Sequence, residues 1–277
     1  MIHYLKLVHM ELSRFSKIYI SLFSFVLLAQ FAIVWMKARE ITNEAAAFNG
    51  LNLNAGPGVL YPMGKVNFAD VMSQSMFYMI PAFLCASVLL LYIFGIWYRD
   101  WLFMNSFIYR LLMLPGPRYS IYFAKLSAII VLVLGMVAYQ LALLPLEITF
   151  FHALVPEELR DTVSTMDYIR SDYILQLLLP STFMAFVIYY GTGLLAVSIL
   201  FTSILIERSY RWKGLAGGIG FAGLCVLIVI SPFLIWDSIE SHLYPMEIFM
   251  MELALGLIVG VMSIWTGMFL IKKKVSV

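Results

Sequence analysis

Residues 121–145 read IYFAKLSAIIVLVLGMVAYQLALLP, and Lys125 is the only charged side chain among them. An α-helix rises about 1.5 Å per residue, so about twenty apolar residues cross a hydrocarbon core roughly 30 Å thick. Such a helix also satisfies its own backbone groups, which lipid cannot do. This stretch therefore predicts a membrane-spanning helix with Lys125 at its start and Pro145 at its end.

Apolar runs of similar length occur in five other places, near residues 18–36, 76–97, 178–206, 214–236 and 248–271. Hydrophobic residues make up 62% of the 277 residues and charged residues 12%, against about 45–50% and about 25% in soluble domains. Outer-membrane strands would be shorter and would alternate in polarity. We therefore predict an all-α, polytopic membrane protein with six transmembrane helices in a single domain over residues 1–277.

Residues 1–17 precede the first run and mix charged with apolar residues. Apolar residues recur there at helical spacing and polar ones fall largely opposite: Leu5, Val8, Leu12 and Phe15 on one face, Lys6, His9, Ser13 and Arg14 on the other. The pattern predicts an amphipathic N-terminal interfacial helix on the cytoplasmic side. No small-residue cleavage site follows, so we expect the first span to remain in the mature protein.

Basic residues near span ends are retained in the cytoplasm, so their placement predicts the orientation. The side that carries both termini holds most of them, namely Lys6, Arg14, Lys17, Arg99, Arg110, Arg118, Lys125, Arg208, Arg211, Lys213 and Lys272 to Lys274. The opposite side holds most acids, including Glu147, Glu157, Glu158, Asp161, Asp167, Asp172, Asp237, Glu240 and Glu247. We predict a multi-pass protein of a bacterial-type plasma (inner) membrane with both termini cytoplasmic.

Three outer segments join the spans on the acidic side. Residues 37–75 are rich in Asn and Gly, which favours turns over a packed domain. Residues 146–177 include a possible short helix that opens with Pro156, Glu157 and Glu158. Residues 232–245 form either a short turn, which is slightly favoured, or a shallow re-entrant hairpin.

No catalytic, cofactor or metal site is expected in this chain. The four histidines are dispersed, and Cys85 and Cys225 lie inside apolar runs, where they are small packing residues. Residues 58–65 resemble a phosphate loop only if its spacing is ignored, so the chain has no means of its own to hydrolyse ATP. The net charge of +2 is too small to predict nucleic acid as a partner.

Two features inside the spans have both an ordinary and a functional interpretation. Glu252 lies about one turn inside the sixth span, where it either reaches the outer interface or faces an internal pathway. Two glycine pairs at one-turn spacing, Gly214 with Gly218 and Gly256 with Gly260, allow close approach of helices. Ordinary packing within the chain is favoured over a specific dimer motif.

The connection between the second and third spans, residues 98–120, is not simply polar. Large apolar residues alternate there with polar ones, and the sequence then runs Leu114-Pro115-Gly116-Pro117-Arg118-Tyr119-Ser120-Ile121, with Lys125 close behind. This order resembles the exporter-type (type-2) permease subunits of ATP-binding cassette (ABC) transporters, in which a Leu-Pro-x-x-Arg-x-x-Ile turn precedes a nearby Lys. The resemblance extends to the six-span layout, the amphipathic N-terminal helix and the long second-to-third connection.

The resemblance implies that residues 100–113 form a cytoplasmic coupling helix that receives movement from a separate ATPase subunit. The residues it implies for ATPase coupling are Asp100, Trp101, Phe107, Arg110, Leu111, Leu112, Pro115 and Arg118. Lipid phosphate is the alternative ligand for Arg110 and Arg118. ATP and magnesium would bind in the partner ATPase, and a second permease subunit, identical or different, would complete the transporter.

The sequence thus favours a permease subunit that exports a peptide, a drug or a lipid-like molecule, or removes an antimicrobial peptide from the membrane. Its partners would be cytoplasmic ABC ATPase subunits, the second permease subunit and membrane lipids. The alternative is a non-transport membrane scaffold or sensor whose outer loops receive a ligand. An intramembrane enzyme ranks third, because the expected paired catalytic groups are missing.

Overall fold

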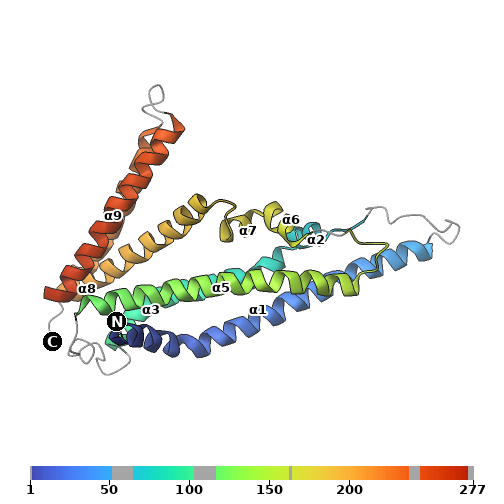
Figure 1. Cartoon of the computed structure of the whole chain (residues 1–277), viewed down its shortest axis with the longest axis horizontal. Coiled ribbons are helices and arrows are strands. Elements are labelled where there is room, and N and C mark those ends of the chain that lie inside the picture. Colours follow the sequence, from blue (N-terminus) through green and yellow to red (C-terminus); the bar gives the residue numbers. More distant parts are fainter. Residues whose placement is uncertain (1, 52–64, 103–116, 162–163, 237–243, 274–277) are drawn as a thin grey trace. The chain divides into compact units, whose positions relative to one another are not determined.

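The computed structural model describes residues 2–51, 65–102, 117–161, 164–236 and 244–273. Its helices are α1 (Ile2–Leu51), α2 (Phe68–Gln74), α3 (Met76–Leu102), α5 (Tyr119–Leu154), α6 (Thr165–Ser171), α7 (Tyr173–Leu178), α8 (Phe183–Trp236) and α9 (Pro245–Lys273) (Figure 1). Within these residues the β-type pairing is limited to one isolated parallel bridge between Val66 and Arg160.

Six helical segments are long and apolar enough to cross a membrane, which confirms the prediction of a polytopic all-α protein. They are Tyr4–Ala47, Phe77–Trp101, Tyr119–Leu154, Phe183–Tyr210, Lys213–Leu234 and Met246–Lys272. The fourth begins at Phe183 rather than near residue 178, because α7 ends at Leu178 and Pro180 follows in the break. Proline has no backbone N–H to continue a helical ladder.

The fourth and fifth spans belong to one element, α8, which reverses its direction. A Cβ atom on Gly218 would lie 2.6 Å from the carbonyl oxygen of Ser203, which is 15 residues earlier in the sequence. A straight helix would separate two such residues by about 22 Å. The chain therefore turns back between Tyr210 and Lys213, and Gly218 permits the close approach of its two arms.

The chain divides into two compact units. The first unit comprises Met1–Ser13, Leu90–Val131 and Val187–Val277, and the second comprises Arg14–Leu89 and Leu132–Phe186. Residues 2–17, predicted to form a separate interfacial helix, are the first part of α1, with no loop between them and the span. Residues 237–243, the middle half of the turn or hairpin predicted over residues 232–245, lie outside the described residues.

The first unit gathers the ends of several helices. The Tyr4 hydroxyl on α1 lies 2.5 Å from the Ser127 hydroxyl on α5. Arg118, just before α5, donates to the carbonyl oxygen of Lys272 on α9 at 3.5 Å. These contacts place the start of α1, the start of α5 and the end of α9 at the same end of the first unit. A chain with an even number of spans begins and ends on the same side of the membrane, so this placement agrees with six spans.

The second unit contains a hydrophobic cluster that joins the long helices to α2, α6 and α7. Its buried members are Val34, Ala38, Ile41, Phe68, Ala69, Met72, Tyr78, Leu144, Ile148, Phe151, Val155, Tyr168, Ile169 and Leu175. The expectation of turns is therefore wrong for residues 37–51 and 68–74, which are helical, whereas residues 52–64 lie outside the described residues. The helix α1 continues to Leu51 because alanine and isoleucine recur at helical spacing and bury one face of it.

The short helix expected at Pro156 is also absent from the described residues. Leu159 N–H donates to the carbonyl oxygen of Pro156 at 3.1 Å, which closes a single turn. The next residues instead pair with Val66, whose N–H donates to Leu159 at 2.8 Å and whose carbonyl accepts from Asp161 at 3.0 Å. These bonds occupy backbone groups that a helix would need, and α6 begins only after the Ser164 cap.

Candidate functional site

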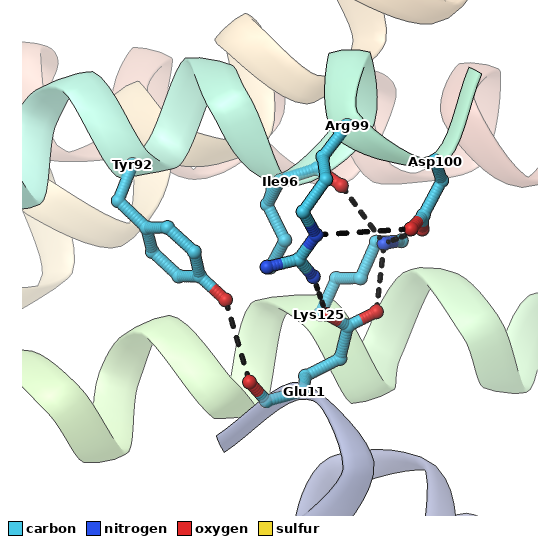
Figure 2. Close-up of polar contacts among 6 residues, drawn as sticks. All are labelled: Glu11, Tyr92, Ile96, Arg99, Asp100 and Lys125. Carbon is cyan, nitrogen blue, oxygen red and sulfur yellow. Dashed lines mark hydrogen bonds and ion pairs between the residues drawn. The ribbon is translucent and has the colours of Figure 1, made fainter. Parts of the chain in front are cut away.

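Four charged side chains from three helices meet inside the first unit. Glu11 comes from α1, Arg99 and Asp100 come from the last turn of α3, and Lys125 comes from the second turn of α5 (Figure 2). We call these four residues the ion network. It lies directly before residues 103–116, which include most of the predicted coupling helix.

Lys125 is the centre of the ion network. Its Nζ lies 2.8 Å from Oε1 of Glu11, 2.5 Å from Oδ2 of Asp100 and 3.1 Å from the carbonyl oxygen of Ile96. A lysine ammonium has three N–H donors, so these three acceptors use all of them. Lys125 therefore binds α1 and α3 to α5 through one atom.

Arg99 completes the network from the other side of Glu11. Its terminal nitrogen lies 2.5 Å from Oε2 of Glu11, and its Nε lies 3.9 Å from Oδ1 of Asp100. Glu11 thus pairs with both cations, one at each carboxylate oxygen. The formal charges of the four residues cancel, which is the condition for placing them together inside a protein.

Burial makes these pairs energetically important. The side chains of Lys125 and Asp100 are 0% exposed and that of Glu11 is 2% exposed, whereas Arg99 is 23% exposed. A charge removed from water costs several kcal/mol unless partners compensate it. Each member of the ion network therefore depends on the others, unlike the exposed Lys37–Glu40 pair on α1.

Aromatic rings surround the cations. Lys125 Nζ lies 5.1 Å from the centre of the Trp97 ring, and the Arg99 guanidinium lies 5.7 Å from the centre of the Tyr92 ring. The negative faces of such rings stabilise a cation where water is excluded. The Tyr92 hydroxyl also donates to the backbone carbonyl of Glu11 at 3.5 Å, which gives α1 and α3 a further contact (Figure 2).

A second set of contacts holds the end of α3 against α8, just before α8 reverses. The Arg208 guanidinium lies 4.8 Å from the centre of the Tyr98 ring and 5.4 Å from that of Trp101. The Tyr98 hydroxyl donates to the neighbouring Glu207 carboxylate. The last turn of α3 is therefore joined to α1, α5 and α8 at once.

The residues predicted for ATPase coupling are only partly described. Asp100 is a member of the ion network, so its carboxylate is directed into the protein rather than toward a partner. Trp101 is half-buried and stacks on Trp97 with ring centres 5.7 Å apart. Arg118 is half-buried near α9. The others, Phe107, Arg110, Leu111, Leu112 and Pro115, lie outside the described residues.

The glycine pairs differ in their surroundings. A Cβ on Gly214 would lie 2.7 Å from the carbonyl oxygen of Ile206, so this position, like Gly218, is in backbone contact with the other arm of α8. A Cβ on Gly256 or Gly260 would meet only Leu195 Cδ1, at 3.5 and 3.9 Å. Glu252, the possible pathway residue, is partly exposed on α9.

Glu11 is not among the residues predicted for a functional role, although the sequence contains a signal for it. Glu11 lies three residues after Val8 and four before Phe15, so it falls on the apolar face of the amphipathic pattern. A charged residue on such a face needs a buried partner of opposite charge. That partner could not be chosen from the sequence, because Lys125 is 114 residues away.

Within the described residues, no group of three or more His, Cys, Asp or Glu side chains could hold a metal ion. Comparisons of the chain with protein-family models, with curated proteins and with solved structures give no match. The ion network and the helices that it joins are therefore the features of the described residues that bear on function.

Proposed function

We propose that this chain is the permease subunit of an ABC transporter, through which ATP hydrolysis in a separate ATPase subunit drives the export of a peptide, a drug or a lipid-like molecule. The observation that carries the proposal is the ion network. It joins three helices at the point where the chain enters residues 103–116, where a force from a partner would have to be received.

The network explains how a local push would reach the rest of the first unit. Asp100 and Arg99 are the last charged residues before residue 103, and they are paired with Lys125 on α5 and Glu11 on α1. Arg208 adds α8 through its contacts with Tyr98 and Trp101. A displacement of the last turn of α3 would therefore move four helices together, which suits a rigid-body switch between two states.

The proposed function requires partner proteins, because this chain would carry the substrate while a separate subunit hydrolyses ATP. Cytoplasmic ABC ATPase subunits would bind ATP and magnesium and dock on residues 103–116. A second permease subunit, identical or different, would provide the other half of the path. Both termini would be cytoplasmic, in agreement with the basic residues at the helix ends of the first unit, such as Arg118, Lys213 and Lys272.

A second candidate function, a membrane sensor or scaffold, is favoured by the packed cluster of the second unit. Lys37 and Glu40 form an exposed ion pair at 2.7 Å, and Arg39 lies 4.4 Å from the centre of the Trp35 ring. Charged residues beside a tryptophan are typical of a membrane boundary. The part of α1 after Arg39, with α2, α6 and α7, would then form a ligand-receiving surface outside the lipid.

The decisive experiment is affinity purification of the full chain from its native membrane, with identification of bound proteins and ATPase assays. We expect an ATPase without spans of its own to co-purify, and we expect ATP hydrolysis by the complex but not by the chain alone. Hydrolysis by the isolated chain, or a purified assembly without any ATPase, would contradict the proposal.

A pair of variants tests where the ATPase docks. Replacing Leu111 and Leu112 with serine should reduce the ATPase recovered with the chain at least tenfold, while the amount of chain in the membrane stays the same. Leu5→Ser is the matched control, because Leu5 is 62% exposed at the start of α1. Equal recovery from the double variant and the control would show that docking occurs elsewhere.

A further inference from the structure

Arg208, near the end of the first arm of α8, is a half-buried arginine of the first unit. Its Nε is buried and has no hydrogen-bond partner among the described residues, and none of their ion pairs includes Arg208. Lys125 and Arg99 of the same unit both pair with Glu11. Arg208 is therefore a partly buried cation that lacks a compensating anion within the described part of the chain.

Two aromatic rings fix the position of the Arg208 guanidinium without using its donors. Its central carbon lies 4.8 Å from the centre of the Tyr98 ring and 5.4 Å from that of Trp101. Ring faces attract a guanidinium through its positive charge, whereas its five N–H groups lie in its own plane and bind oxygen acceptors. The guanidinium is therefore held in place for a ligand that supplies such oxygens.

The two acids near this position already have partners. Glu207 follows Ile206 directly before Arg208, and its carboxylate accepts from the Tyr98 hydroxyl. Asp100, at the end of α3, is fully buried and pairs with Lys125. Neither carboxylate supplies an acceptor to the buried Nε of Arg208.

A second cation lies on the returning arm of α8. Lys213 is exposed, and a Cβ on the next residue, Gly214, would lie 2.7 Å from the carbonyl oxygen of Ile206. The reversal therefore brings Lys213 back beside the last turn of the first arm, which carries Arg208. Two cations at one reversal create a positive local potential, which attracts an anion.

Arg208 also lies at the level where a membrane presents phosphate. It is two residues before the end of the fourth span, which is about 3 Å of helix rise, and Trp101 is the last residue of the second span. Aromatic residues at span ends are typical of the membrane–water interface. On the returning arm Leu215 and Ile219 are 50% and 67% exposed, so acyl chains can lie against it.

We propose that Arg208, between the rings of Tyr98 and Trp101, binds the phosphate group of a membrane phospholipid, with Lys213 as a second contact. A phosphate offers several oxygens to the planar fork of guanidinium donors. The bound lipid would complete the joint between α3 and α8, because its phosphate neutralises the cation that lies between them. The proposal concerns contacts of the first unit alone and does not rest on the permease function.

The test counts the phospholipid that the full chain retains. The chain is purified in a maltoside detergent, titrated with dioleoyl-phosphatidylglycerol and measured by native mass spectrometry. The first lipid should bind to Arg208→Gln at least about fivefold more weakly than to the native chain, the loss expected for one cation at a lipid phosphate.

Lys6→Gln is the matched control, because it removes the same charge from an exposed residue of the same unit. It should bind the lipid like the native chain. An equal loss of affinity in Arg208→Gln and Lys6→Gln would overturn the proposal, since diffuse attraction to the positive charge of the chain would then account for the binding.

Three further outcomes separate phospholipid from other ligands. Dioleoylglycerol, which has the same acyl chains and no phosphate, should not be retained, and equal retention would contradict recognition of phosphate. Inorganic phosphate in excess should not displace the lipid, and displacement would assign the site to free phosphate. Reduced recovery of a co-purifying ATPase from Arg208→Gln, with lipid binding unchanged, would assign the guanidinium to a protein partner and refute lipid binding.

Photo-crosslinking of the native chain keeps the proposal testable if Arg208→Gln does not fold. Phosphatidylglycerol with a photoreactive group on its headgroup should label peptides that contain Trp101 or Lys213, identified by mass spectrometry after digestion. Excess unlabelled phosphatidylglycerol should abolish this labelling. Labelling confined to other segments of the chain would overturn the proposal.

Discussion

Replacement of Lys125 by methionine tests the ion network directly. Methionine has a similar length and no charge, so the change leaves Glu11 and Asp100 buried with only Arg99 to compensate them. Removal of one partner from a buried ion pair costs about 3–5 kcal/mol, because an uncompensated charge remains. Lys125 is fully buried and pairs with two carboxylates, so we expect a loss in the upper part of this range.

The assay is reversible unfolding of the purified chain in mixed detergent micelles, followed by tryptophan fluorescence. Trp97, whose ring centre lies 5.1 Å from Lys125 Nζ, is a local reporter. Lys37→Met is the matched control, because Lys37 pairs with Glu40 at a similar distance on an exposed surface. We expect this control to lose no more than about 1 kcal/mol.

A double variant separates charge from packing. Asp100→Asn combined with Lys125→Met removes one charge of each sign, so the remaining pair, Glu11 with Arg99, is again neutral. The cost of the double variant should therefore be smaller than the summed costs of Asp100→Asn and Lys125→Met, by about 1–3 kcal/mol of coupling energy. The reasoning is refuted if Lys125→Met costs no more than Lys37→Met, or if Asp100→Asn adds its full cost to that of Lys125→Met.

Two further predictions concern α8. Gly218→Ala places a methyl group within 2.6 Å of the Ser203 carbonyl oxygen and should lower the thermal midpoint by several degrees. Gly223→Ala is the control, because Gly223 has open space around it, and it should change the midpoint little. Equal effects of the two substitutions would contradict the reversal of α8. Arg208→Gln removes the contacts of the guanidinium with two rings of α3 and should lower the free energy of unfolding by about 1–2 kcal/mol in the same assay. Arg208→Lys keeps the charge and should recover part of this loss. An unchanged free energy of unfolding in Arg208→Gln would show that α8 is not joined to α3.

Much of the fold could be predicted from the sequence because lipid permits few solutions. A run such as residues 121–145 has to be a helix, since nothing else satisfies its backbone in hydrocarbon. The break before the fourth span was misplaced because residues 177–179 are all leucine, and only the backbone shows that the helix stops near Pro180. The packed second unit was missed for a related reason. Residues 52–64 are rich in turn formers, and their composition concealed the helical pattern of α1 before them and of α2 after them.

The sequence by itself determined that this protein spans a membrane with six helices, because length and polarity are local properties of each segment. Only the tertiary structure decided that Glu11, Arg99, Asp100 and Lys125 compensate one another. The sequence gives the type of a charged residue but does not show whether water, a cation or a hydrophobic cluster surrounds it. The free energy of that charge depends on neighbours that the fold brings from distant parts of the chain, as it brings Lys125 on α5 to Glu11 on α1.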